Sequence, residues 1–164
     1  MTHPQTVWHY TLGIYIDQIL ADGEIRLSVD GHRADRPNER TIAWFSADQN
    51  WEKTSTKNLT ENGIRKALSK SELEQIGNGL YRIGVSTNDS LVKPWMRLKK
   101  LARLTDRTIQ VLEDSAEAIG ANPFDWWGAL VPVRSNHWTA VEHLSGGLWR
   151  QWVPAPSAET GGAA

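Results

Sequence analysis

Three short segments of the chain combine aromatic residues with groups that could bind or activate a ligand. In the first, Trp8-His9-Tyr10-Thr11, alternation along a strand sends His9 and Thr11 to one face and the two aromatic residues to the other. Histidine needs a partner for each ring nitrogen, so His9 and Thr11 could point together into a cleft as hydrogen-bonding groups. A core histidine satisfied by its neighbours is an equally good explanation of this segment.

The second segment, Trp44-Phe45-Ser46 followed by Trp51, suits a flat ring that is bound by stacking. Tryptophan offers a large π-face, and Ser46 offers a hydroxyl that could orient the bound ring. Plain core packing is the alternative, and it suits Trp44 better than Trp51.

The third segment places Glu142 inside a strand of mostly apolar and aromatic residues, from Trp138 to His143. An unpaired carboxylate is costly to bury, so Glu142 either faces solvent or has a functional role. Alternation puts Trp138 and Ala140 on its face and Val141 on the other. Because both faces carry apolar residues, the pattern leaves the inward face open.

A fourth feature is a basic run between positions 93 and 107, and it is the only one that suggests a macromolecular partner. The run consists of Lys93, Arg97, Lys99, Lys100, Arg103 and Arg107. Lys93, Arg97, Lys100 and Arg103 are its candidates for contact with a phosphate backbone, although a solvated helix face is the commoner explanation. The sequence contains no HExxH zinc motif, no GxGxxG or Walker phosphate loop, and no GxSxG nucleophile motif.

Composition restricts the chemistry further. The 164 residues include 18 basic and 19 acidic residues and no cysteine, which excludes thiol catalysis, disulfides and cysteine-metal sites. Nine tryptophans against two phenylalanines indicate an unusually tryptophan-rich interior. The chain has neither a signal-peptide pattern nor a long apolar run, so we expect a cytoplasmic protein with no membrane partner.

The elements that must position these residues follow from periodicity and from breaking residues. In the first half we expect strands at Val7–Thr11, Ile25–Val29 and Thr41–Ser46, a helix at Gly13–Ala21 that stops at Asp22-Gly23, and a loop at Asp30–Arg40. The segment KTSTKNLTENG looks like a loop, and one short helix is expected within Glu61–Ile76.

In the second half of the chain, the sequence pattern predicts two helices and four strands. A helix beginning near Pro94 would bury Trp95, Leu98, Leu101 and Ala102, and a helix capped by Thr105 or Asp106 would bury Ile109, Leu112, Ala116 and Ile119 before Gly120 and Pro123 end it. Strands are expected at Leu80–Ser86, Trp127–Val133, Trp138–Leu144 and Leu148–Val153, with a turn at Ser145-Gly146-Gly147. The chain is therefore predicted to be a single α+β domain over residues 1–153, with a disordered tail at 154–164.

The segments VWHYTLGIYIDQILADGEIRLS, TIAWFS and WTAVEHL together resemble the ADP-ribosyltransferase fold. The order of a histidine strand, an aromatic and hydroxyl strand, and a late glutamate is similar to the H–Y–E branch, near the DNA-targeting ADP-ribosyltransferase toxins. The resemblance implies split antiparallel sheets with flanking helices, and NAD as the substrate. The match departs at the second motif, where Trp44-Phe45-Ser46 stands in place of the family's tyrosine.

The resemblance also implies residue roles. His9 would bind a ribose hydroxyl of NAD, and the Tyr10 backbone would hold the nicotinamide amide. Glu142 would bind the nicotinamide ribose and stabilise positive charge as the glycosidic bond breaks. The ring wall would come from Phe45 or Trp44. The expected nucleotide-binding residues are thus His9, Tyr10, Thr11, Trp44, Phe45, Ser46 and Trp51.

Three functions are compatible with this pattern. The first is an NAD-using enzyme that transfers ADP-ribose to a nucleic acid or a protein. The second is a non-catalytic module that binds a nucleotide or a nucleic acid in an aromatic pocket. The third is an interaction factor that blocks a host protein.

Overall fold

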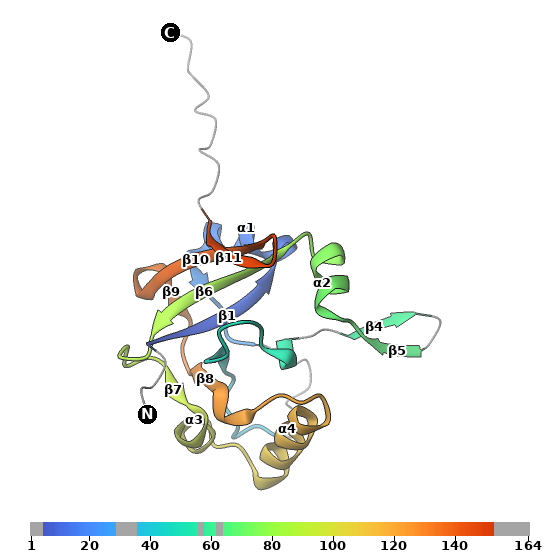
Figure 1. Ribbon diagram of the computed structural model, residues 1–164. Helices are drawn as coiled ribbons and strands as arrows, with labels where there is room; N and C mark the ends of the chain where they lie inside the picture. Colours follow the sequence, from blue (N-terminus) through green and yellow to red (C-terminus); the bar gives the residue numbers. More distant parts are fainter. Residues whose placement is uncertain (1–4, 29–35, 56–57, 62–63, 153–164) are drawn as a thin grey trace.

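The computed structural model describes residues 5–28, 36–55, 58–61 and 64–152. One antiparallel sheet has the strand order β11-β10-β6-β1-β3-β8-β7, so β1 is its middle strand (Figure 1). Its members are β1 (Thr6–Leu12), β3 (Ala43–Ser46), β6 (Leu80–Ser86), β7 (Lys93–Pro94), β8 (Trp126–Ala129), β10 (Trp138–Ser145) and β11 (Leu148–Gln151). Two further antiparallel pairs are β2 (Glu24–Ile25) with β9 (Val133–Arg134), and β4 (Asn58–Glu61) with β5 (Ile64–Ala67). The helices are α1 (Gly13–Asp22), α2 (Lys70–Ile76), α3 (Trp95–Leu101) and α4 (Asp106–Ala118), with 3-10 turns at η1 (Lys53–Ser55), η2 (Pro123–Asp125) and η3 (Ser135–His137).

The seven-stranded sheet parts into two halves between β1 and β3. Every residue of β1 pairs with β6, from Thr6 opposite Ser86 to Leu12 opposite Leu80. By contrast, β1 and β3 share one ladder pair, Trp8 opposite Ser46. We call β1, β6, β10 and β11 the β1 half, and β3, β7 and β8 the β3 half.

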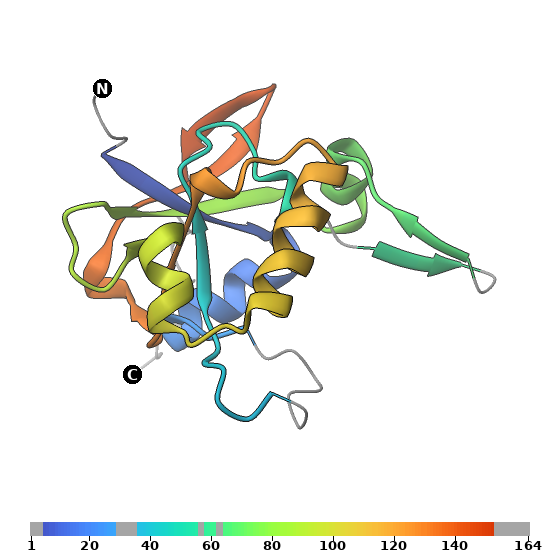
Figure 2. The same cartoon turned by 90° about the horizontal axis from the view of Figure 1, so that it is seen from below.

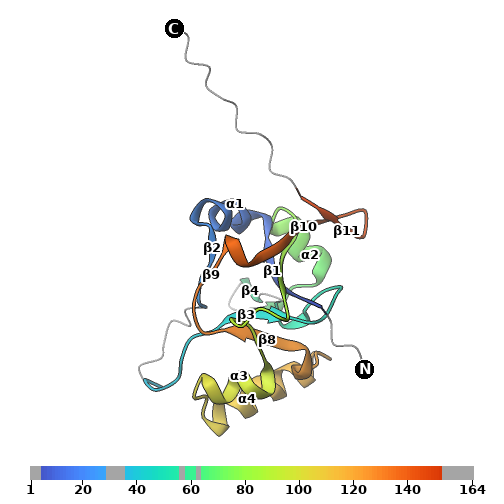
Figure 3. The same ribbon diagram turned by 90° about the vertical axis from the view of Figure 1, so that its left-hand side faces the viewer.

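Helices cover the two halves from opposite ends of the molecule. Figure 3 shows α1 beyond the strands of the β1 half and α3 with α4 beyond those of the β3 half. In Figure 2, the view from below, β3 is seen between α3 and α4. Buried side chains form three clusters, the first of which contains residues of both halves. Their main members are Val7, Ile16, Phe45 and Ile83 in the first, Trp8, Tyr10, Trp51 and Leu73 in the second, and Trp95, Leu98, Ala116 and Trp126 in the third.

The predicted α+β class is confirmed, and the strongest local signals placed their elements correctly. The first strand and first helix lie where alternation and helical periodicity put them, and Gly23 ends the helix in the left-handed conformation at φ 66°. Thr105 caps α4 by accepting the amide N–H of Thr108 at 3.2 Å.

The segment after Trp51 contains a hairpin that the sequence analysis missed. It was predicted to be a loop, but β4 and β5 pair there, and the hairpin projects away from the rest of the domain (Figures 1 and 2). The Asn-Gly dipeptide at positions 62–63 is the signal that could have found it, because this dipeptide favours two-residue hairpin turns. The one short helix expected nearby is confirmed as α2.

Two predicted strands are shorter than expected. The segment Trp127–Val133 is not one strand: β8 ends at Ala129, and Val133 opens β9, which pairs with β2 in a different sheet. Pro132 lies between them, and proline cannot donate to a continuing ladder. The strand expected at Ile25–Val29 ends at Ile25, and Val29 lies outside the described residues.

Two residues expected in the core are exposed. Leu101 is 42% exposed because α3 packs through Trp95, Leu98 and Ala102. Ile119 is 47% exposed because it follows the last residue of α4 and leaves the helical stripe. The tail at 154–164 and most of the loop at Asp30–Arg40 lie outside the described residues.

Candidate functional site

The candidate site is formed by β1 and β3 at the point where the two strands part. Just beyond their single ladder pair, His9 Nδ1 donates to the main-chain carbonyl of Trp44 over 2.9 Å. Because a carbonyl can only accept, this bond requires Nδ1 to carry the proton. The half-buried imidazole also lies 5.8 Å from the ring of Phe45, centroid to centroid. A side chain therefore bridges the strands where the main-chain ladder has ended.

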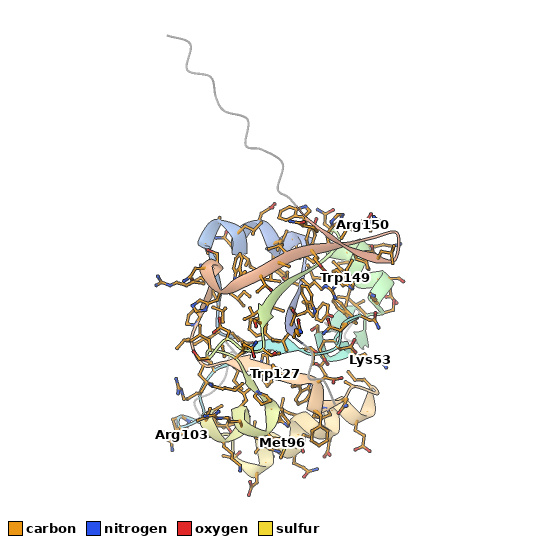
Figure 4. The ribbon with its side chains drawn as sticks, turned by 60° about the vertical axis from the view of Figure 1, so that its left-hand side comes forward. Lys53, Met96, Arg103, Trp127, Trp149 and Arg150 are labelled. Atoms are coloured by element: carbon orange, nitrogen blue, oxygen red, sulfur yellow. The ribbon has the colours of Figure 1, made fainter. Side chains whose placement is uncertain are left out.

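Aromatic residues continue from His9 across the β3 half. Trp127 lies directly opposite Phe45 on β8, so both side chains share a face of the sheet. Trp127 is half-buried, and Figure 4 shows it between the α3 region and the β10–β11 region. Thr11 lies two residues after His9 on the same face and is buried. We call His9, Thr11, Phe45 and Trp127 the His9 face.

The Tyr10 side chain lies on the opposite face of β1 and is fully engaged. Its hydroxyl donates to the main-chain carbonyl of Asp48, and its ring lies 5.1 Å from Trp51 and 5.7 Å from Trp149. Burial raises the pKa of the Tyr10 hydroxyl far above its usual range, even though Arg82 opposes this shift. The phenol is therefore a structural donor.

Arg82 on β6 contacts four residues on this face: Trp8, Trp149, Glu142 and Gln49. Its guanidinium lies 3.8 Å from the ring centroid of Trp8 and 4.5 Å from that of Trp149. Two of its nitrogens bind Glu142 Oε2 at 2.7 and 2.6 Å, and a third donates to the carbonyl of Gln49. These contacts combine ion pairing with cation–π stacking on both sides of the guanidinium. We call these five residues the Arg82 clamp.

The expected meeting of His9 and Glu142 across one crevice does not occur. On β6, Ile83 lies opposite both His9 and Val141, whereas Arg82 lies opposite both Tyr10 and Glu142. Paired residues share a face and successive residues alternate, so Glu142 lies on the opposite face from His9.

A β-bulge explains why the sequence left the face of Glu142 undecided. The register of β10 against β6 shifts between Trp138 and Ala140. Trp138 consequently packs on the cluster that contains Phe45, while Ala140 packs on the cluster that contains Trp8. The predicted common face of Trp138 and Ala140 is therefore wrong.

Ser46 is held by a buried carboxylate that the sequence analysis did not single out. Glu52 is 7% exposed and accepts the Ser46 hydroxyl at 2.6 Å. Its other oxygen accepts the Thr54 hydroxyl at 2.6 Å and amide N–H at 3.1 Å, and the Trp126 indole N–H at 3.3 Å. This hydrogen-bonding makes burial of the charge tolerable. The Ser46 hydroxyl, expected to orient a ligand, is thus committed to Glu52.

The predicted ring-binding aromatic residues are divided among different environments. The ring centroid of Trp44 lies 5.9 Å from those of both Trp95 and Trp126, in the cluster under α3 and α4. Trp51 is buried against Tyr10, and its indole N–H has no hydrogen-bond partner within the described ranges. Of the three aromatic residues proposed for ring binding, Phe45 shares a face with His9.

Acidic groups gather near the end of β3. Burial, together with the charges of Asp48 and Glu52, raises the pKa of Asp125. In the part of the chain that the structure describes, no group of three histidine or acidic residues could hold a metal ion.

The four predicted basic residues are not all on one surface. Lys93 is half-buried in β7, opposite Gly128. Arg97 and Lys100 are exposed on α3, and Arg103 is exposed just after it.

Comparisons with protein-family models, with curated proteins and with solved structures found no match to this chain. Among the described residues, no helix has the length and apolar character needed to cross a bilayer.

Proposed function

We propose that this chain is an ADP-ribosyltransferase-like protein that binds NAD, or a related nucleotide, on the His9 face where β1 parts from β3. The proposal depends mainly on one observation: the ladder between these strands stops at Trp8 and Ser46, and the His9 imidazole lies immediately beyond that point. The resemblance implies split antiparallel sheets and a strand that carries a nucleotide-binding histidine, and both expectations support the proposal.

The main chain of Tyr10 supports the same proposal. Its ladder partner is Arg82 on β6, whereas the ladder with β3 does not reach it. Main-chain N–H and C=O groups on such an edge can bind an amide, because they match its donor and acceptor. Under this proposal the nicotinamide carboxamide takes that position, as the resemblance implies, and the half-buried Trp127, which packs beside the buried Phe45, contributes aromatic surface.

The position of Glu142 favours a second candidate, the non-catalytic nucleotide-binding module. Transfer would break the bond between nicotinamide and ribose, and the resemblance assigns Glu142 to stabilise the positive charge that develops. Glu142 is instead ion-paired with Arg82 at 2.6 Å on the opposite face. The position of Glu142 therefore favours nucleotide binding without transfer. If transfer does occur, we propose a nucleic acid or a protein as the acceptor.

Binding can be tested by titrating NAD while tryptophan fluorescence is recorded, with calorimetry as a second readout. We expect saturable binding that His9→Gln weakens about tenfold, the equivalent of one hydrogen bond of about 1.4 kcal/mol. The control is His137→Gln, since His137 is also half-buried but pairs with Asp89 elsewhere. Absence of saturable binding, or equal losses in the two variants, would refute the proposal.

Transfer can be tested separately with NAD that is radiolabelled in the adenylate part. The wild-type protein is incubated with DNA, RNA and protein acceptors, and released nicotinamide and labelled acceptor are measured. Turnover that requires His9 supports the enzyme. Binding without turnover supports the non-catalytic module.

A further inference from the structure

The exposed side of α3 carries a group of cations that lies apart from the nucleotide site. Trp95 and Leu98 turn inward, which leaves Arg97 and Lys100 adjacent on the solvent side of the helix. Arg103 follows the helix, and Arg107 lies in the first turn of α4; both are exposed. We call Arg97, Lys100, Arg103 and Arg107 the α3 patch.

No carboxylate within the described ranges forms an ion pair with a member of the α3 patch. Their neighbour Lys99 differs, because it binds Glu113 at 3.2 Å and lies over the Trp95 ring. Asp106 is the one acidic residue between positions 97 and 107. The chain as a whole has a net charge of -1, so the positive charge of this patch is local.

Arg103 has a backbone conformation that is energetically unfavourable for arginine. Its φ of 55° lies in the left-handed region, and its amide N–H closes the helix on the carbonyl of Lys100 at 3.1 Å. Glycine usually fills this position, because a Cβ there is unfavourable by roughly 1 kcal/mol. A positive side chain near a helix C-terminus recovers part of that cost. The exposed Arg103 side chain therefore leaves the backbone directly after the C-terminus of α3.

We propose that the α3 patch binds the phosphate backbone of a nucleic acid. Three of its four members are arginines, whose planar guanidinium matches phosphate oxygens in two-point contacts. An anionic membrane suits the patch less well, because α3 has only seven residues, of which Met96 and Leu101 are the exposed large apolar ones. Lys93 belongs to the same basic run of the sequence but is half-buried in β7, so it is not part of the patch, whereas Arg107 from that run is exposed and is part of it.

This inference does not depend on the proposed nucleotide site. Figure 4 shows Arg103 and Met96 at one end of the molecule, with Trp127 between them and the β10–β11 region. None of the four cations belongs to the His9 face. Loss of NAD binding and loss of nucleic-acid binding can therefore be measured in separate variants.

The experiment compares two triple variants with equal changes in charge. The patch variant carries Arg97→Gln, Lys100→Gln and Arg103→Asn, with asparagine chosen because it tolerates the left-handed region. The control variant carries Arg26→Gln, Arg134→Gln and Arg150→Gln, three exposed arginines outside α3 and the turn after it. Binding to fluorescein-labelled 20-nucleotide single-stranded DNA, duplex DNA and RNA is measured by anisotropy between 50 and 200 mM salt. Thermal unfolding verifies that both variants are folded.

We expect the full chain to bind at least one of these probes at 50 mM salt. The affinity should fall with a slope of log K against log salt of about −3, from about 0.7–0.9 per neutralised phosphate. The patch variant should lose at least about tenfold in affinity and reduce that slope by about 2, while the control loses less than twofold. Absence of binding by the wild type, equal losses in both variants, or binding to phosphatidylserine vesicles in place of nucleic acid would overturn the proposal.

Discussion

The two faces of β1 differ in how their polar groups are used. On one face, Trp8, Tyr10 and Arg82 direct their donors at the loop that follows β3. The indole of Trp8 binds the Gln49 side chain at 2.9 Å, the phenol of Tyr10 binds the Asp48 carbonyl, and Arg82 binds the Gln49 carbonyl. On the other face, His9 donates to the carbonyl of Trp44, beside the rings of Phe45 and Trp127.

Adjacent residues of β1 therefore differ in role: Tyr10 helps to hold the loop after β3, whereas His9 lies on the face where we propose that a ligand binds. The Arg82 clamp holds a charge that is buried and compensated, and its geometry leaves the Glu142 carboxylate committed to Arg82. Such a network stabilises one arrangement of the loop after β3, because breaking any bond leaves a buried polar group unpaired. The His9 face lies where the sheet parts, and we expect ligand binding there.

The largest effect expected from breaking this contrast is that of Arg82→Leu. The substitution removes the guanidinium from between Trp8 and Trp149 and leaves Glu142 without its partner, which should cost about 3–5 kcal/mol of unfolding free energy. Urea unfolding measures the loss. Arg150→Leu on β11 is the control, and a comparable loss there would remove the special status of the clamp.

Glu52→Gln should have the next largest effect. Glutamine keeps one carbonyl oxygen, so at least one donor among Ser46, Thr54 and Trp126 loses its acceptor, at a cost of about 2 kcal/mol. Thermal unfolding compares this variant with Glu117→Gln on the exposed side of α4. Unchanged stability of Glu52→Gln would mean that the buried carboxylate is not a structural group.

Glu142→Gln sharpens the comparison between the two faces directly. It weakens the ion pair with Arg82 but retains a neutral acceptor, so we expect a loss of about 1 kcal/mol in stability. NAD affinity should stay within twofold of the wild type, in contrast to His9→Gln. A stable Glu142→Gln protein that binds NAD but has lost its transfer activity would reverse our assignment and make Glu142 catalytic.

The smallest effect concerns Asp125, near the end of β3. Because burial and the charges of Asp48 and Glu52 raise its pKa in the folded chain, ionisation of Asp125 destabilises the fold as pH rises through that pKa. Asp125→Asn should therefore stabilise the protein at pH 7 by about 0.5 kcal/mol, typical of a partly exposed charge interaction. The gain should vanish near pH 3, where the wild-type carboxyl is also neutral. Thermal unfolding at both pH values, with Asp17→Asn as control, provides the measurement.

Much of the fold was predictable because its signals are local. The β1 strand, α1 with its glycine stop, and α4 with its threonine cap each depend on residues within a few positions of one another. The β4–β5 hairpin was missed because its polar residues were judged by composition, although the Asn-Gly dipeptide carried a turn signal. The separation of β8 from β9 was not predicted, because β9 pairs with β2, a strand that is distant in sequence.

The candidate site was predictable only in part. His9 and Phe45 were selected for their residue types, and the structure brings their rings within 5.8 Å. Glu142 was selected by the same reasoning, yet it pairs with Arg82, a residue to which the sequence analysis gave no role. Ser46 was expected to orient a ligand but hydrogen-bonds Glu52 instead.

The sequence by itself determined which residues of β1 share a face, because alternation is a property of the extended backbone. It could not determine which residue of a distant strand joins each face, since that depends on the register across β6. A bulge of one residue in β10 is enough to change the register. Tertiary pairing therefore decided that Glu142 shares a face with Tyr10 and Arg82, and that His9 lies on the opposite face, where β1 parts from β3.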